Sequence, residues 1–184
     1  YETMNLDPDI VTLGKIVGGG FPIGVISGKN EFMNYANTSA FSKSSRAYIG
    51  GGTFSANPLS MIAGSSTLSA IKKKGNRLYQ KLNAFGSETR KMLDKKFDGN
   101  VITTGIGSLF LTHFLSNQVH EISSAADAAK CNVKKLHNYH FHMIANGGIF
   151  FLPGKLGAYS DTHTKSDISA IAKSTDKYLT IFKK

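Results

Sequence analysis

Short apolar runs and longer patterns of helical spacing alternate along the chain, which favours an α/β fold. The first run, residues 9–13, is nearly all apolar and rich in β-branched residues, as in a strand buried on both faces of a parallel sheet. A second strand is predicted at 23–28, after three consecutive glycines at 18–20. Such a glycine run predicts a turn that another group approaches closely.

Residues 34–52 show little apolar periodicity, so they are predicted to form a long irregular loop. A helix is predicted to begin at Asn57 and Pro58, since asparagine caps helices well and proline suits the first helical position. The pattern continues to Gly75, a plausible stop. A second, amphipathic helix is predicted over the lysine-rich stretch 72–96.

The pattern changes to a smaller α+β arrangement in the rest of the chain. A capping pair of Thr164 and Asp167 predicts the start of the last helix. The earlier predicted elements are a strand pair at 101–104 and 108–115, a helix at 124–146 and a short strand at 149–152.

Two domains follow from this organisation, residues 1–72 and 73–184. The composition, with 41% hydrophobic and 18% charged residues, is that of a globular protein and excludes disordered and collagen-like classes. No apolar run reaches the roughly 18 residues of a membrane-spanning helix, so membrane partners are not expected. One cysteine, Cys131, cannot form an intrachain disulfide, and a cytoplasmic location is expected.

The net charge of +10 raises the possibility of a non-catalytic module that binds nucleic acid. Positive side chains concentrate between Lys72 and Lys96, but helical spacing places them opposite the apolar stripe, on a solvated face. No interleaved arginine, glycine and aromatic residues support base stacking. A solvated face is therefore the preferred interpretation, with no nucleic-acid partner expected.

Lys15 follows the first predicted strand and precedes the three glycines. A lysine at the carboxyl end of a buried strand lies where α/β sheets bind ligands, and a desolvated amine can attack a carbonyl to form a Schiff base. An ordinary surface lysine at a strand end is the alternative. A nucleotide-binding P-loop is excluded, because its glycines precede the lysine.

Gly52 and Thr53 lie in a second glycine-rich segment, residues 50–58, just before the predicted helix start. Free N–H groups and the positive helix end make such a segment a candidate phosphate site. A simple loop with a helix cap is the alternative.

The segments 13–24 and 52–58 together closely resemble the class III aminotransferases among the fold-type-I pyridoxal-phosphate enzymes. Within that family they are most similar to the aminomutases that act on glutamate 1-semialdehyde in tetrapyrrole synthesis. The resemblance covers nearly the whole chain. It implies the latter part of the family's large domain, followed by a small α+β carboxyl-terminal domain.

By this resemblance, Lys15 would be the catalytic residue, holding pyridoxal 5'-phosphate through a Schiff base and moving the substrate α-proton. Gly52 and Thr53 would bind the cofactor phosphate of the neighbouring subunit in a homodimer. Residues 34–52 would correspond to the family's active-site gate. The substrate would be a small amino acid.

Two departures from the family pattern matter. The family's remaining cofactor contacts lie before the lysine, so the chain is expected to be a carboxyl-terminal piece, inactive alone, whose missing part was lost or is supplied by a separate chain. Aminomutases also carry a Ser-x-Phe-Glu-like segment where this chain has residues 153–158, without a carboxylate. A related transaminase acting on another amino acid or a β-amino acid is therefore the alternative.

Three histidines cluster at 137–142, but no further ligand has the spacing that zinc requires. No metal site is predicted, and Cys131 is expected to be an inert residue within the helix at 124–146.

Overall fold

The computed structural model describes residues 4–37, 39, 42, 45–49 and 51–182. The chain divides into two compact units, residues 1–75 (unit 1) and residues 76–184 (unit 2). Each unit is described by itself below.

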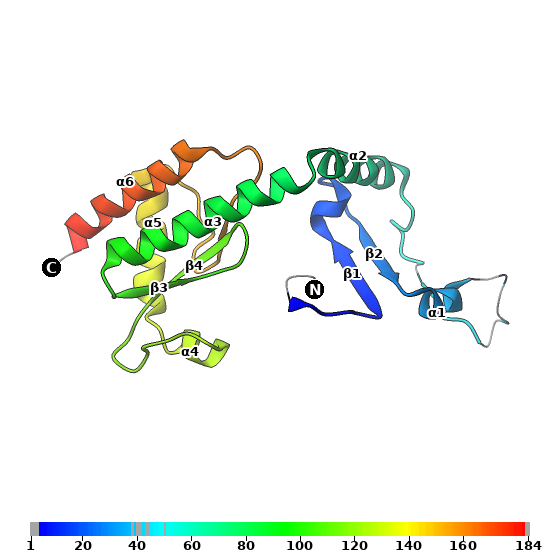
Figure 1. Ribbon diagram of the computed structural model, residues 1–184, viewed down its shortest axis with the longest axis horizontal. Coiled ribbons are helices and arrows are strands. Elements are labelled where there is room, and N and C mark those ends of the chain that lie inside the picture. Colours follow the sequence, from blue (N-terminus) through cyan, green and yellow to red (C-terminus); the bar gives the residue numbers. More distant parts are fainter. Residues whose placement is uncertain (1–3, 38, 40–41, 43–44, 50, 183–184) are drawn as a thin grey trace. The chain divides into compact units, whose positions relative to one another are not determined.

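Unit 1 contains a β-hairpin and one long helix (Figure 1). Strand β1, Ile10–Gly14, pairs antiparallel with β2, Gly24–Gly28, and the 3₁₀ turn η2, Lys15–Gly18, follows β1 directly. Two short helical turns come after the hairpin, and the long helix α2 ends the unit. Their bounds are α1, Asn30–Met33; η3, Asn34–Ala36; and α2, Pro58–Lys74.

The first strand is where it was predicted, but its expected burial in a parallel sheet is wrong for this chain. β1 pairs antiparallel with β2, and its residues Ile10 and Leu13 are 51% and 45% exposed. A continuous apolar run indicates burial on both faces. The described part of unit 1 does not supply the surfaces that would cover it.

Helix α2 begins and ends as predicted. The Asn57 side chain accepts hydrogen bonds from the N–H groups of Leu59 and Ser60, at 3.1 and 3.2 Å. Pro58 occupies the first turn and Gly75 caps the other end. The loop predicted at 34–52 begins with the 3₁₀ turn η3, and its described residues after Ala36 contain no helix or strand.

Unit 2 is an α+β layer in which helices cover a three-stranded antiparallel sheet (Figure 1). Helices α3 and α5 pack against the sheet, and α6 packs against both helices. The strands are β3, Val101–Thr104; β4, Leu109–Phe114; and β5, Gly157–Ala158, in the order β3-β4-β5. The helices are α3, Asn76–Phe97; α4, Ala125–Ala129; α5, Val133–Gly147; and α6, Lys165–Phe182.

Aromatic side chains form the centre of unit 2. The rings of Phe97, Phe114 and Tyr139 meet edge to face with centroids 5.1 to 5.9 Å apart, and Tyr178 packs against all three. Such pairs add to the stabilisation from buried apolar area. The Tyr139 hydroxyl, which is buried, forms a hydrogen bond with Thr175 Oγ1 at 2.8 Å. The core of unit 2 is therefore both apolar and hydrogen-bonded.

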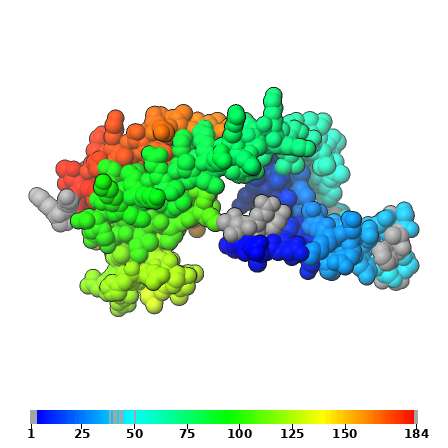
Figure 2. Space-filling model, in the orientation of Figure 1, coloured from blue at the N-terminus to red at the C-terminus, as the bar shows by residue number. Residues whose placement is uncertain are grey.

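The single helix predicted at 124–146 is wrong, because the chain forms α4 and α5 with a break at Lys130–Asn132. Asn132 caps the second helix by accepting a hydrogen bond from the Lys135 N–H, and its own N–H donates to Phe114 O in β4. This hydrogen bond to β4 changes the direction of the chain between α4 and α5. The segment that contains α4 projects from the rest of unit 2 (Figure 2).

The strand predicted at 149–152 is also wrong. The edge of β4 pairs instead with β5, in the register Leu109 opposite Ala158. Gly148 adopts a left-handed conformation and Ile149 donates to Met143 O, so the chain turns back on α5 where the strand was expected. No helix among the described residues is long and apolar enough to cross a membrane.

Candidate functional site

Lys15 is the first residue after β1 and opens the η2 turn. Its φ of 56° lies in the left-handed region, which side chains other than glycine rarely adopt. The side chain is exposed, and no hydrogen bond or ion pair within the described part of the chain involves its amine. The described residues of this chain therefore do not form the dry environment that was expected around this amine.

The close approach predicted at the glycine run is made by the chain's own helix α2. A Cβ on Gly19 would lie 2.7 Å from Ala63 O, and one on Gly64 would lie 2.6 Å from Val17 O. These contacts are between η2 and the backbone of α2. The close approach that the glycines permit is thus used by the chain's own helix, which holds the Lys15 turn in place.

Thr53 lies in a double turn that leads into α2. The N–H of Ser55 donates to Gly52 O at 2.9 Å, and the N–H of Asn57 donates to Phe54 O at 3.2 Å. Within the described residues, the N–H groups of Gly52, Thr53 and Phe54 and the Thr53 hydroxyl have no recorded acceptor or donor. This turn therefore presents several uncommitted donors side by side.

The free N–H donors of segment 50–58 lie in the Thr53 turn, because the N–H groups in the first turn of α2 already have acceptors. Asn57 occupies the N–H groups of Leu59 and Ser60 through its side chain and that of Met61 through its carbonyl. Pro58 has no N–H group. An anion at Thr53 would therefore be held by the turn itself and by the helix dipole.

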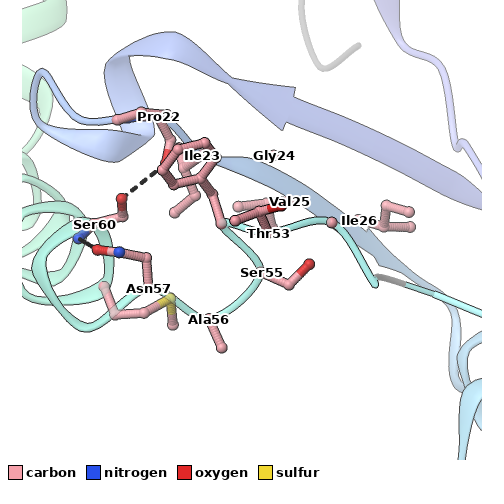
Figure 3. Close-up of a pocket in the computed structure, with 13 residues that line it drawn as sticks. Pro22, Ile23, Gly24, Val25, Ile26, Thr53, Ser55, Ala56, Asn57 and Ser60 are labelled. Carbon is pink, nitrogen blue, oxygen red and sulfur yellow. Dashed lines mark hydrogen bonds between the residues drawn. The ribbon is translucent and has the colours of Figure 1, made fainter.

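A cleft of about 730 Å³ separates this turn from β2 (Figure 3). Thr53 and Gly52 line it from one side, and Val25 and Ile26 line it from the other. The volume is within the range of small-molecule sites. Lys15 is not among the lining residues, so the structure brings Gly52 and Thr53 together but does not bring Lys15 to the same cleft.

Ser60 is a residue of this cleft that the sequence did not single out. It lies in the first turn of α2, is only 3% exposed, and donates from its hydroxyl to Pro22 O at 2.8 Å (Figure 3). A serine within a helical pattern carries no local signal of such a bond, because its partner lies 38 residues earlier in the chain.

Several basic side chains of the stretch Lys72–Lys96 already have partners within this chain, so only some of them are available to an external partner. Lys81 pairs with Asp161, Lys96 pairs with Asp176, and Arg90 donates to Leu109 O at 2.7 Å. Phe85, Leu93 and Phe97 of the same helix are buried, which confirms its predicted amphipathic character.

The histidines at 137–142 have structural contacts. His140 stacks on Phe151 with centroids 4.8 Å apart and accepts a hydrogen bond from the Gly154 N–H at 3.1 Å. Burial lowers the pKa of His140 to about 4. The described residues contain no group of three or more histidine, cysteine, aspartate or glutamate side chains that could hold a metal ion.

Cys131 does not lie within a helix as expected, because it falls in the break between α4 and α5. Its thiol pKa is raised, first by burial and then by Asp127. A raised pKa reduces the thiolate form, which is the reactive one.

The family model of the class-III aminotransferases matches residues 1–144, and the chain belongs to this family. Similar curated proteins include glutamate-1-semialdehyde 2,1-aminomutases from Sulfolobus acidocaldarius, 31% identical over 90% of this chain, and Methanosphaera stadtmanae, 33% identical over 97%. The chain spans about two fifths of their length, 38% and 40% respectively.

Solved structures agree on the fold. A β-phenylalanine aminotransferase from Variovorax paradoxus matches with a TM-score of 0.79 and 23% identity, over 97% of this chain and 40% of that one. A transaminase with PLP bound matches with a TM-score of 0.74 and 22% identity, over 100% of this chain and 41% of that one. The family is dependent on pyridoxal phosphate.

The residues of the cleft fit the phosphate of this cofactor. None of the 13 lining residues is charged, so no carboxylate repels a dianion there. The Thr53 hydroxyl and the N–H groups of Gly52 and Thr53 are neutral donors of the kind that bind phosphate.

Proposed function

We propose that this chain is the part of a glutamate-1-semialdehyde 2,1-aminomutase-like enzyme that carries the cofactor-bearing lysine. The observation that supports this most directly is the left-handed backbone of Lys15 at the end of β1. A lysine is costly in this conformation, and such strain is typically retained at functional positions. Curated aminomutases at 31% and 33% identity support the reaction type.

The roles of the residues follow from their chemistry. Lys15 would hold pyridoxal 5'-phosphate covalently through Nζ and, when released, would carry a proton between substrate atoms. Gly52 and Thr53 would hold the phosphate with their N–H groups and the Thr53 hydroxyl. When bound, the cofactor supplies the electron sink for breaking the substrate C–H bond.

In this proposal, a second polypeptide surface completes the site around Lys15. Lys15 and the Thr53 cleft lie apart in this chain, and the Lys15 amine is exposed. In the complete enzyme, a homodimer, Gly52 and Thr53 would serve the cofactor of the neighbouring subunit. The remaining three fifths of the family length, whether joined to this chain or supplied as a separate chain, would cover the amine and exclude water.

A transaminase acting on another amino acid or a β-amino acid is the second candidate. It is favoured by the segment Pro153–Ala158, which has no carboxylate. This segment forms a turn in which the Lys155 N–H donates to Leu152 O at 2.9 Å, and the exposed Lys155 side chain could meet a substrate carboxylate.

The test combines the chain with a polypeptide comprising the remaining three fifths of the Methanosphaera stadtmanae relative, in the presence of pyridoxal phosphate. We expect a visible absorption band, and borohydride reduction should label Lys15 permanently. Lys15→Arg keeps the charge but should lose both band and label, whereas Lys91→Arg, an exposed lysine of α3, should keep them. A band that survives in Lys15→Arg would show that Lys15 does not hold the cofactor.

The same assembly distinguishes the two candidates. Conversion of glutamate 1-semialdehyde to 5-aminolevulinate without an added amino acceptor supports the aminomutase. Turnover that requires a separate amino donor and acceptor supports the transaminase.

A further inference from the structure

Ser60 is the buried polar side chain of unit 1. Of the described residues of this unit, only Gly18, Ser60 and Gly64 are buried, and Ser60 is the one of them with a side chain that can form a hydrogen bond. Its hydroxyl donates to Pro22 O at 2.8 Å, across 38 residues of sequence (Figure 3). A buried, directional bond of this kind selects one arrangement of the segments that it joins.

The bond completes a path between the two walls of the cleft. On one side, Phe54 O accepts from the Asn57 N–H at 3.2 Å, and Asn57 Oδ1 accepts from the Ser60 N–H at 3.2 Å. On the other side, the Ser60 hydroxyl reaches Pro22, which directly precedes Ile23 and β2. Hydrogen bonds therefore run from the Thr53 turn through the start of α2 to the entry of β2.

The same helix also holds the Lys15 turn. One turn further along α2, Gly64 meets Val17 O and Ala63 meets Gly19 through close backbone contacts. These contacts are steric and act from η2, whereas the Ser60 bond is polar and acts at the opposite end of the glycine run. Together they attach the segment between Lys15 and β2 to α2 at two places.

We propose that Ser60 is a positioning residue that holds the Thr53 turn against the entry of β2, and so sets the width of the cleft in which Gly52 and Thr53 bind phosphate. The phosphate part of this inference rests on the proposed function. The positional part does not, because it concerns only the attachment of the turn to β2. Ser60 itself touches no reacting atom in this role.

The test uses the chain 1–184, labelled with ¹⁵N, and inorganic phosphate as the probe. Hydrogen exchange is followed at the Leu59 and Ser60 amides, and phosphate binding at the amides of Gly52, Thr53 and Phe54. In Ser60→Ala we expect both amide exchange and the phosphate dissociation constant to rise about threefold to tenfold, the size typical of one hydrogen bond. Alanine favours helix, so α2 itself remains formed.

Two further variants distinguish the loss of the Ser60 hydrogen bond from a general effect of substitution in α2. Ser60→Thr keeps the hydroxyl and should restore both values to those of the wild type. Ser66→Ala removes an exposed hydroxyl from the same helix and should change neither.

The outcomes are distinguishable. Unchanged amide exchange in Ser60→Ala, or wild-type Leu59 and Ser60 amides that exchange as fast as in an unstructured peptide, would overturn the positional role. Faster exchange in Ser60→Ala with no phosphate binding in any form, wild type included, would support the positional role and instead refute the phosphate site at Thr53.

Discussion

Lys15 shows how a single residue combines sequence and structural information. Its place between an apolar strand and a glycine run identified it as a candidate, and the family resemblance assigned it a role. Its left-handed backbone was not predictable, because a lysine in that conformation is disfavoured by about 1–2 kcal/mol relative to the right-handed one. The turn that contains Lys15 packs on α2 through close backbone contacts at Gly19 and Gly64, which lie beyond the reach of a local sequence pattern.

His140 gives a prediction at the scale of one residue. Burial lowers its pKa to about 4 in the folded chain, while the unfolded value is about 6.5. The unfolded state therefore takes up the proton first, so the free energy of unfolding is highest above pH ~6.5. It should fall below that pH by up to about 1.4 kcal/mol per pH unit and level off near pH ~4.

The free energy of unfolding is measured by urea titration between pH 4 and 8, with unfolding monitored by the circular dichroism of the tyrosine side chains. His140→Phe keeps a ring against Phe151 but binds no proton, so its pH slope should be smaller. His113, whose pKa is also lowered by burial, accounts for a remaining slope. His120→Gln, at an exposed position, is the control and should match the wild type. Equal slopes in wild type and His140→Phe would contradict the prediction.

At the scale of elements, α2 is the helix that the sequence described best. Its start at Asn57 and Pro58 and its stop at Gly75 depend on side chains within the same turn, so local residue types were sufficient. The free N–H donors of segment 50–58 lie in the Thr53 turn and not in the first turn of α2, where the Asn57 side chain accepts from Leu59 and Ser60.

Replacing the cap of α2 has an expected cost. Asn57→Ala leaves the N–H groups of Leu59 and Ser60 without their acceptor and should destabilise the first turn by about 1 kcal/mol. Hydrogen exchange at these two amides should accelerate by roughly fivefold. Asn57→Asp retains the accepting oxygen and should stay near the wild-type rate. An Asn57→Ala variant with unaltered exchange would show that the cap does not hold this turn.

Elements in the second half were harder to predict. The helix break at Lys130–Asn132 depends on a bond from the Asn132 N–H to Phe114 O, whose partner lies in another element. The apolar run at 149–152 resembled a strand, but β4 pairs with residues 157–158 instead. Apolar composition indicates burial, and it does not choose between a strand and an irregular segment.

At the scale of the whole molecule, the two units differ in their cores. All the buried apolar side chains of the described chain belong to unit 2, from Phe85 to Tyr178. In unit 1, side chains such as Ile16, Phe54 and Ile62 are 65 to 70% exposed. We therefore expect this apolar surface of unit 1 to pack against further polypeptide in the complete protein.

This contrast predicts different behaviour for the two units when they are separated. Residues 76–184 alone should unfold in one cooperative transition, because they retain the complete aromatic core. Residues 1–75 alone should self-associate and bind a hydrophobic dye, since a two-stranded hairpin with exposed apolar faces is marginal in water. Analytical ultracentrifugation and dye fluorescence measure both. A monomeric 1–75 fragment that binds no dye would contradict this account.

The sequence by itself determined the family, the candidates Lys15, Gly52 and Thr53, the ends of α2 and the buried face of α3. Each of these depends on residue types at short spacing, where neighbours along the chain are also neighbours in space. The tertiary structure decided the bond from Ser60 to Pro22, the break before α5, the partner of β4 and the separation of Lys15 from the Thr53 cleft. Those features depend on contacts between residues far apart in sequence, which no local pattern encodes.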